Sequence, residues 1–213
     1  MTLQLMTMFV TSAALISPVT TGSLRHAWLH HRRSVLTQLL RKNLAMISDN
    51  DNENYIKSYR IHGTGMRSAV EMKTSTGHNI YTDVPIKMGG RDEAPQPVEH
   101  LLAALIGCTQ ATAVYVGRMM KPRLIIERIE FDLEGFRDER GALELPIEQV
   151  PSIPARLELI TGVVKMHFKK GITPSAEQLM TLKEQTEARC PVASMMLASG
   201  CKMDISWIDQ TVT

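Results

Sequence analysis

Two cysteines far apart in the chain occupy positions at which a thiol can take part in chemistry. Cys108 ends the segment 97–108, which is apolar after its first turn, and Cys190 stands directly before Pro191. A helix through the first segment and a helix break at the proline would hold each thiol in a defined place. A fold that brings the two thiols together would make a redox couple of them.

Cys190 has a local sequence that favours the thiolate. Proline disfavours helical geometry at the residue before it, so we expect a new helical turn to begin at Pro191 with Cys190 at its N-cap. Free backbone N–H groups at that end, together with the adjacent Arg189, lower the pKa of a thiol below its free value of about 8.5. The alternative is a small buried residue that fills the kink, since free cysteines are often buried.

Cys108 is expected in the middle of an apolar helix, where burial raises the pKa of a thiol and where a plain core cysteine is the alternative. Glu99 and His100 are polar residues in the first turn of that helix, and Glu99 is a candidate site residue. The helix dipole favours an acidic group there and by itself explains Glu99. The functional interpretation is an acceptor that orients an arginine or a substrate.

The third cysteine, Cys201, follows Gly200 at the start of the last expected strand and is interpreted as structural. None of the three cysteines lies two to four residues from another, and no histidine stands at ligand spacing from them, so we expect no metal. Three cysteines also do not form a secreted disulfide framework. We expect no organic cofactor either.

Short periodic segments predict strands around these helices. Residues 129–133 and 202–208 alternate apolar and polar side chains, which is typical of half-buried strands. Further strands are expected at 55–61, 68–73, 78–84 and 157–168, with a turn at Gly63-Thr-Gly65. The strands at 129–133 and 157–168 are expected to pair antiparallel, and 141–156 is expected to be an extended excursion because it contains three prolines.

Two helices complete the pattern. Pro97 suits the first position of a helix that continues to Met120, and this helix is apolar all round at 101–108. A second helix is expected over 175–188, capped by Thr173 or Ser175. The resulting order of strands, helix, two strands, helix and strand predicts an α+β domain with no internal repeat and no βαβ run. A central helix that is apolar on all faces must be buried by more than one chain can supply. We therefore predict a homodimer.

The first 48 residues differ in composition from the rest. They contain no Asp or Glu and five Arg or Lys residues, the profile of a mitochondrial transit peptide. The alternatives are a disordered or cloning-derived tail, which leaves the protein cytoplasmic, and a secretory signal. We therefore divide the chain into an extension at 1–52 and a domain at 53–213.

Charge and hydropathy exclude two classes of partner. Once the five positive charges of the extension are set aside, the remaining chain is slightly acidic, so it has no electrostatic footprint for nucleic acid. The apolar run at 3–16 is too short, and too rich in Thr and Ser, to span a bilayer. We expect no nucleic-acid and no membrane partner.

The segment Gly89-Gly-Arg-Asp-Glu-Ala-Pro-Gln-Pro-Val-Glu-His-Leu-Leu-Ala-Ala-Leu-Ile-Gly-Cys108-Thr, followed by Cys190-Pro-Val, resembles the OsmC/Ohr superfamily over about residues 55–210. The closest similarity is to its OsmC-like branch. The resemblance implies antiparallel sheets packed around two long central helices in an intertwined homodimer. It also implies thiol-dependent reduction of organic hydroperoxides in oxidative-stress defence.

By this resemblance Cys108 is the peroxidatic thiolate, which is oxidised to a sulfenic acid, and Cys190 is the resolving thiol, which forms a disulfide with it. A dithiol reductant, lipoyl or thioredoxin-like, would restore both thiols, and neither metal nor organic cofactor is needed. Glu99 stands one residue later than the glutamate of the best-characterised peroxidases, with Val98 in its place. Arg67 and Arg91 are both candidates for the activating arginine.

A second hypothesis belongs to another class of protein. The chain would then be a redox-responsive or ligand-binding dimer that holds a hydrophobic molecule in an apolar pocket near Cys108, with slow or no peroxidase turnover. The feature that favours it is the lack of a clear activating arginine. Loss of free thiol on addition of peroxide separates the two hypotheses.

Overall fold

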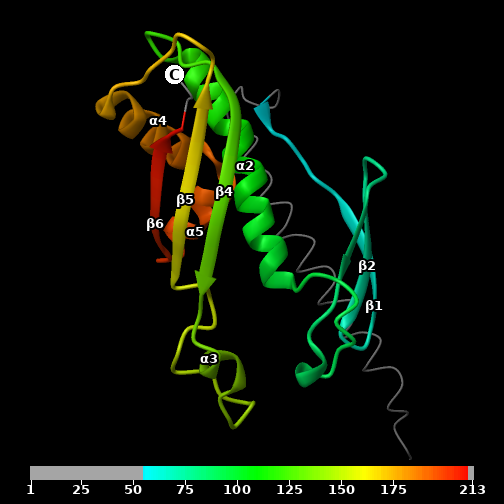
Figure 1. Ribbon diagram of the computed structural model, residues 1–213. Coiled ribbons are helices and arrows are strands. Elements are labelled where there is room, and N and C mark those ends of the chain that lie inside the picture. Colours follow the sequence, from blue (N-terminus) through cyan, green and yellow to red (C-terminus); the bar gives the residue numbers. More distant parts are fainter. Residues whose placement is uncertain (1–54, 211–213) are drawn as a thin grey trace, which may run out of the picture. The chain divides into compact units, whose positions relative to one another are not determined.

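The computed structural model describes residues 55–210 (Figure 1). The predicted extension at 1–52, with its targeting interpretation, lies outside the described residues. The chain divides into two units, residues 1–59 and 60–213, and every helix and strand described below belongs to the second unit.

The first sheet contains the antiparallel strands β1 (Ile61–Met66), β2 (Ala69–Thr74) and β3 (Asn79–Thr82) in that order. The strand expected at 55–61 is wrong, because the first strand begins only at Ile61. The turn expected at Gly63–Gly65 is also wrong, because both glycines lie inside β1. The turn is made instead at Arg67, whose φ of 57° is left-handed. Gly63 allows the Met72 side chain of β2 to pack against β1, since a Cβ at Gly63 would lie 2.9 Å from Met72 Cγ.

The long helix α2 (Pro97–Met119) has Pro97 at its first position, as predicted. Among the described residues, α2 is long and apolar enough to cross a membrane. Core helices of soluble proteins can have the same length and composition. Leu105 and Ala113 are buried against the rest of the unit. The opposite face is uncovered in the single chain, where Tyr115 is 56% and Met119 63% exposed.

The second sheet contains β4 (Ile126–Phe136), β5 (Leu159–Phe168) and β6 (Lys202–Asp209) in that order. β4 and β5 pair antiparallel, as predicted. β6 pairs parallel to β5, so the chain does contain one βαβ unit, contrary to the sequence interpretation. The reason is that two helices connect β5 to β6 and return the chain to the end at which β5 began.

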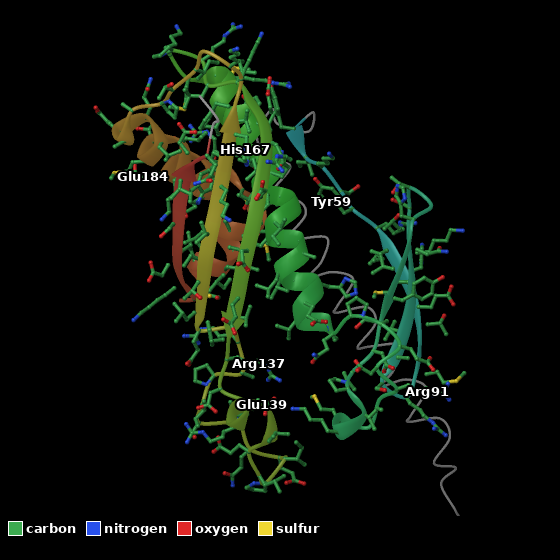
Figure 2. The ribbon with its side chains drawn as sticks, viewed as in Figure 1. Tyr59, Arg91, Arg137, Glu139, His167 and Glu184 are labelled. Carbon is green, nitrogen blue, oxygen red and sulfur yellow. The ribbon has the colours of Figure 1, made fainter. Side chains whose placement is uncertain are left out.

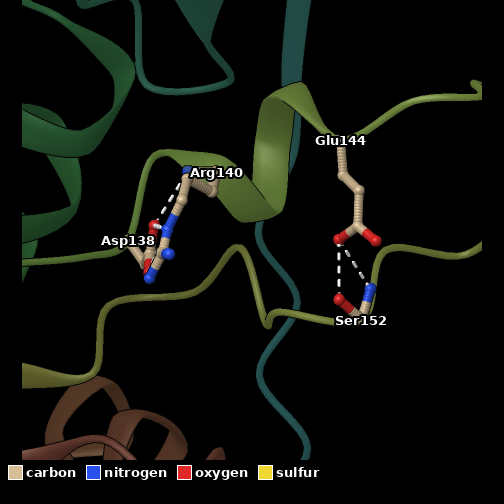
Figure 3. A network of polar contacts seen from close by, with 4 residues as sticks. All are labelled: Asp138, Arg140, Glu144 and Ser152. Carbon is tan, nitrogen blue, oxygen red and sulfur yellow. Dashed lines mark hydrogen bonds and ion pairs between the residues drawn. The ribbon is translucent and has the colours of Figure 1, made fainter.

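The excursion between β4 and β5 is irregular apart from the short helix α3 (Arg140–Leu143). Its loops are tied by local polar contacts (Figure 3). Arg140 Nε donates to Asp138 Oδ1 at 3.0 Å, and the backbone N–H and hydroxyl of Ser152 both donate to Glu144 Oε2. The excursion expected for 141–156 is present, but it is a series of turns and bends after one helical turn and is not extended.

Helices α4 (Ala176–Arg189) and α5 (Pro191–Ala198) pack against α2 and β6, and Figure 1 shows the three helices along one face of the second sheet. Ser175 caps α4, its hydroxyl accepting from Gln178 N at 3.1 Å. The core lies between these helices and the sheet. Its fully buried members include Leu105, Ile160, Met166 and Leu182.

Candidate functional site

Cys190 joins two helices. It ends α4, where its backbone N–H donates to Thr186 O at 2.8 Å, and it is also the N-cap of α5. Its Sγ accepts a hydrogen bond from Ala193 N at 3.4 Å. The helix break and the N-cap position predicted from Pro191 are both confirmed. The thiol is fully buried in the core.

Cys108 lies on α2 and is partly buried. The packing of α2 against α4 and α5 brings its thiol close enough to that of Cys190 for Cys108 to raise the pKa of Cys190. Eighty-two positions separate these residues in the chain, so the contact is a product of the tertiary fold. Both cysteines are free thiols here.

The pKa of Cys190 is raised, against the direction expected from its N-cap position. Burial is the largest cause, and the neighbouring Cys108 thiol raises the pKa further. The N–H of Ala193 favours the thiolate but does not outweigh these two effects. Burial wins because desolvation of a charge costs more than one weak N–H···S bond returns. Cys190 is therefore held as a protonated thiol beside Cys108.

A narrow cleft of about 10 Å³ lies between the helices and the second sheet, and neither cysteine lines it. Thr109, the neighbour of Cys108, and Ala193, the donor to Cys190, both line it. Its other walls come from α2, α4 and the three strands of the second sheet. That volume holds about one water molecule, far below the 300 Å³ at which ligand pockets begin. Cys108 does not line this cleft, so the expected apolar ligand pocket near Cys108 stays a prediction.

One polar residue of the cleft was not foreseen. Glu187, on α4 one turn before Cys190, is the ionisable side chain that lines the cleft among the described residues. Its carboxylate lies 4.0 Å from Lys183 Nζ. Burial raises its pKa, Glu184 adds to that effect, and Lys183 opposes it. The signal in the sequence was the spacing of Lys183, Glu187 and Cys190 on one helix face.

Glu99 stabilises the start of α2, which is the structural alternative considered from the sequence. Its Oε2 accepts from the backbone N–H of Gln96 at 2.7 Å, as half of a capping box at the start of α2. Nine residues of helix separate it from Cys108, which is about 13 Å along the axis. In the single chain it therefore caps the helix, and its expected action on a substrate stays a prediction.

The two candidate arginines lie together, but away from the cleft. Arg67 and Arg91 both line a separate cavity of about 270 Å³ beside the loop that precedes α2. The guanidinium of Arg91 pairs with Glu93 at 3.9 Å in an exposed position (Figure 2). Neither arginine is among the groups that shift the pKa of Cys190, so the choice between them stays open.

Asp83 organises that loop, and the sequence interpretation missed it. Its buried carboxylate accepts from Ser68 Oγ and from the backbone N–H groups of Val84, Arg91 and Glu93. These hydrogen bonds, that from Arg91 first, lower the pKa of Asp83 to about 2. The loop geometry is tight, because a Cβ on Gly90 would lie 1.8 Å from Val84 O.

Cys201 is buried in the core, and its Sγ donates to Lys202 O at 3.6 Å, consistent with the structural interpretation. Burial raises its pKa. His167 is hydrogen-bonded on the outer face of the second sheet, where its Nε2 lies 3.0 Å from Glu130 Oε1 (Figure 2). Within residues 55–210, no group of three His, Cys, Asp or Glu side chains is placed to hold a metal ion.

Comparison with known proteins places this arrangement in a family. The family model described as OsmC-like protein matches residues 90–206, more than half of the chain, and both cysteines fall within the match. No match was found among the curated proteins.

Solved structures share the fold. An OsmC-like protein from Mycoplasma pneumoniae has a TM-score of 0.54 at 19% identity, over 72% of this chain and 97% of that one. An OsmC-like protein of unknown function from Vibrio cholerae has a TM-score of 0.55 at 12% identity, over 72% and 99%. An organic hydroperoxide resistance protein from Elizabethkingia anophelis has a TM-score of 0.52 at 14% identity, over 73% and 98%.

Proposed function

The chain belongs to the OsmC-like protein family, and on that premise we propose that it reduces organic hydroperoxides with Cys108 and Cys190 as its redox pair, in defence against oxidative stress. The closeness of the two thiols, which the effect of Cys108 on the pKa of Cys190 reports, is the observation that supports this most directly. The fold shared with organic hydroperoxide resistance proteins, such as that from Elizabethkingia anophelis, agrees with the substrate class.

The first half of the proposed reaction oxidises Cys108. Its thiolate attacks the terminal oxygen of the hydroperoxide, the O–O bond breaks, and the alkoxide leaves and takes up a proton to become an alcohol. Sulfur is oxidised to a sulfenic acid and the peroxide is reduced. Cys108 is suited to this step because it is only partly buried, whereas Cys190 is closed off from solvent.

The second half closes the disulfide. The Cys190 thiol loses its proton and attacks the sulfur of the Cys108 sulfenic acid, the S–O bond breaks, and the hydroxyl leaves with a proton as water. A dithiol reductant, lipoyl or thioredoxin-like, then reduces the disulfide by thiol exchange. The closeness of the two thiols in the core supports this step.

A second copy of the chain is part of this proposal. The uncovered face of α2 carries exposed Leu101, Tyr115 and Met119, which is costly for an isolated chain in water. Pairing of two copies through these helices would bury that face and would place the partner near Cys108. The pocket for the organic part of the substrate would then form between the copies.

The competing hypothesis is a redox-responsive or ligand-binding dimer without turnover. The cleft of about 10 Å³ itself is too small to hold such a ligand. The two functions are separated by measuring the loss of free thiol with cumene hydroperoxide and with hydrogen peroxide. A peroxidase of this kind consumes the organic peroxide faster, whereas a binding protein consumes neither.

We also propose that residues 1–48 direct the protein to mitochondria, on the ground of their basic, acid-free composition. A fusion of residues 1–48 to a fluorescent reporter tests this. Mitochondrial fluorescence is expected, and a diffuse cytosolic reporter would favour the cytoplasmic alternative.

A further inference from the structure

The end of the second unit at which α2 finishes is strongly basic. Segments 117–130 and 165–170 together contain seven Lys or Arg residues against two Glu residues. The other described residues contain twelve Lys or Arg against seventeen Asp or Glu, so the charges of the described chain are separated in space. Six of the cations are exposed, and we call them the basic end: Arg118, Lys121, Arg123, Arg128, Lys169 and Lys170.

Backbone hydrogen bonds hold the two segments of the basic end side by side. Leu124 N donates to Gly117 O at 2.9 Å, and Lys169 N donates to Ile125 O at 2.8 Å. β4 and β5 pair with each other from that point onward. Figure 1 shows the same meeting of the end of α2, the start of β4 and the end of β5. The six cations therefore belong to neighbouring stretches of backbone.

The loop that carries Lys121 and Arg123 is fixed in place. Leu124, which follows them, is 2% exposed and belongs to the core. The loop backbone lies directly against α2, since a Cβ on Gly117 would lie 2.6 Å from Leu124 O. A partner that binds here does not have to order this backbone, which lowers the cost of association.

Little negative charge opposes the basic end from within. Arg128 lies 2.8 Å from Glu130 Oε1, and the same oxygen lies 3.0 Å from His167 Nε2. Among the described residues, no hydrogen bond or ion pair involves the side chains of the other five cations. Their charge is therefore available to an anionic partner.

Stabilisation of α2 accounts for only part of this charge. Arg118 in the last turn, and Lys121 just beyond it, lie where a cation is favourable at the C-terminal end of a helix. Lys169 and Lys170 follow the end of β5, where no helix ends. Strands have only small net dipoles, so the same explanation does not apply to these two lysines.

We propose that the basic end is a docking surface for an acidic protein segment, a stretch of a partner protein rich in Asp and Glu. Charge complementarity identifies this partner, since ammonium and guanidinium groups bind carboxylates through charge-assisted hydrogen bonds. The inference does not depend on the peroxidase function, because it uses none of the residues placed in that reaction.

Two other polyanions fit the basic end less well. Single-stranded nucleic acid is bound with exposed aromatic side chains on which the bases stack, and a bilayer surface is bound with exposed Trp, Phe or Leu. Phe168 and Leu124 of these segments are both buried. Met119 is exposed, but it lies on the face of α2 that the proposed dimer covers. An acidic segment needs the charge alone.

A matched pair of labelled peptides tests the charge requirement on the full chain by fluorescence anisotropy. A peptide of about eight glutamates should bind saturably at about 0.15 M salt, and the same peptide with glutamine in place of glutamate should not bind. The affinity should fall at least about tenfold as the salt rises from about 0.05 M to about 0.5 M, because exposed charges are screened.

Charge reversal in each segment tests whether the two segments form one surface. Lys121→Glu with Arg123→Glu, and separately Lys169→Glu with Lys170→Glu, should each weaken binding of the glutamate peptide at least about tenfold. The neutral pair Lys169→Gln with Lys170→Gln should fall between its charge-reversed counterpart and the wild type. All four side chains are exposed, so each variant should melt within about two degrees of the wild type.

A matched control reverses two charges in the region of the first sheet. Lys73 on β2 and Lys87 in the short 3-10 helix η2 (Ile86–Met88) are exposed, and reversing both changes the net charge by the same amount. Lys73→Glu with Lys87→Glu should bind the peptide within about twofold of the wild type. Residues 1–48 carry five further cations, which every variant keeps. Differences between the variants therefore report the basic end.

Carbodiimide cross-linking locates the peptide on the wild type without any substitution. It joins a peptide carboxylate to a nearby lysine amine, and mass spectrometry should find the new amide bonds at Lys121, Lys169 and Lys170. Cross-links confined to lysines outside the basic end would overturn the proposal. So would equal binding of the glutamate and glutamine peptides, or equal weakening by the control pair. Tighter binding to phosphatidylserine vesicles or to DNA than to the glutamate peptide would assign the surface to a lipid or nucleic-acid partner instead.

Discussion

At the scale of single residues, Asp83 holds the loop before α2 in place. Four donors from Ser68, Val84, Arg91 and Glu93 converge on its two carboxylate oxygens. An acceptor-only group is required, since every partner donates. The loop that begins α2, and with it the start of the helix that carries Cys108, therefore depends on an ionised Asp83.

Asp83→Asn should lower the melting temperature at pH 7, because the amide turns N–H donors toward groups that also donate. The pKa of about 2 lies below the unfolded value, so the stability that Asp83 contributes is complete above about pH 4 and is lost as the pH falls toward 2. The variant should lose less stability than the wild type over that interval. Thermal melts from pH 7 to pH 2.5 measure both effects.

Asp92→Asn is the matched control, since Asp92 is exposed and asparagine tolerates its left-handed φ of 59°. It should melt within a degree or so of the wild type. Equal melting temperatures for Asp83→Asn and Asp92→Asn would show that the buried carboxylate does not organise the loop.

The roles of individual residues in the site were harder to predict from the sequence than the positions of its helices. Cys108 and Cys190 were identified from their local contexts, and the N-cap at Cys190 followed from Pro191. Asp83 was not found, because its importance arises from hydrogen-bond donors that belong to other segments. The pKa of Cys190 was expected to fall and instead rises, because burial depends on packing that no local sequence shows.

At the scale of elements, the backbones of the paired strands β4 and β5 lie unusually close at Gly162. This glycine has φ +146°, and a Cβ there would lie 2.0 Å from Asp132 O of the neighbouring strand. The close approach sets the register in which β5 presents Val164 to the cleft and pairs with β6. The position therefore requires glycine for two reasons, backbone conformation and contact.

Gly162→Ala should destabilise the protein by at least about 3 kcal/mol, since it adds a backbone clash to an unfavourable φ. Gly171→Ala is the matched comparison. Gly171 also has a positive φ, of 86°, but nothing lies within 4 Å of its Cβ position, so its cost should be nearer 1 kcal/mol. Urea denaturation gives both values, and equal costs would mean that the sheet relaxes to accept the clash.

The helices were predictable and the first turn was not. Pro97, Ser175 and Pro191 carry the signals that begin helices, and each helix starts where these residues place it. Gly63 and Gly65 look like turn residues but lie inside β1, where the missing Cβ of Gly63 leaves room for Met72 of β2. The parallel pairing of β6 also escaped the sequence, because strand direction follows from the path of the connecting helices.

At the scale of the whole molecule, the proposed dimer explains why α2 has an uncovered apolar face. Tyr115→Asp places a charge on that face and should shift the protein from dimer to monomer at micromolar concentration, as measured by sedimentation velocity. Val150→Asp is the control, because Val150 is 92% exposed on the excursion between β4 and β5. A wild type that sediments as a monomer at these concentrations would contradict the dimer.

The central claim is that Cys108 and Cys190 form one redox centre, and thiol counting after oxidation tests it most directly. One equivalent of organic hydroperoxide should remove two thiols per chain from the wild type and leave Cys201 free, as identified by mass spectrometry of alkylated peptides. Cys190→Ser should stop at a trappable sulfenic acid on Cys108, and Cys108→Ser should consume no peroxide. If Cys108→Ser consumes peroxide as fast as the wild type, or if no Cys108–Cys190 disulfide forms, the account is contradicted.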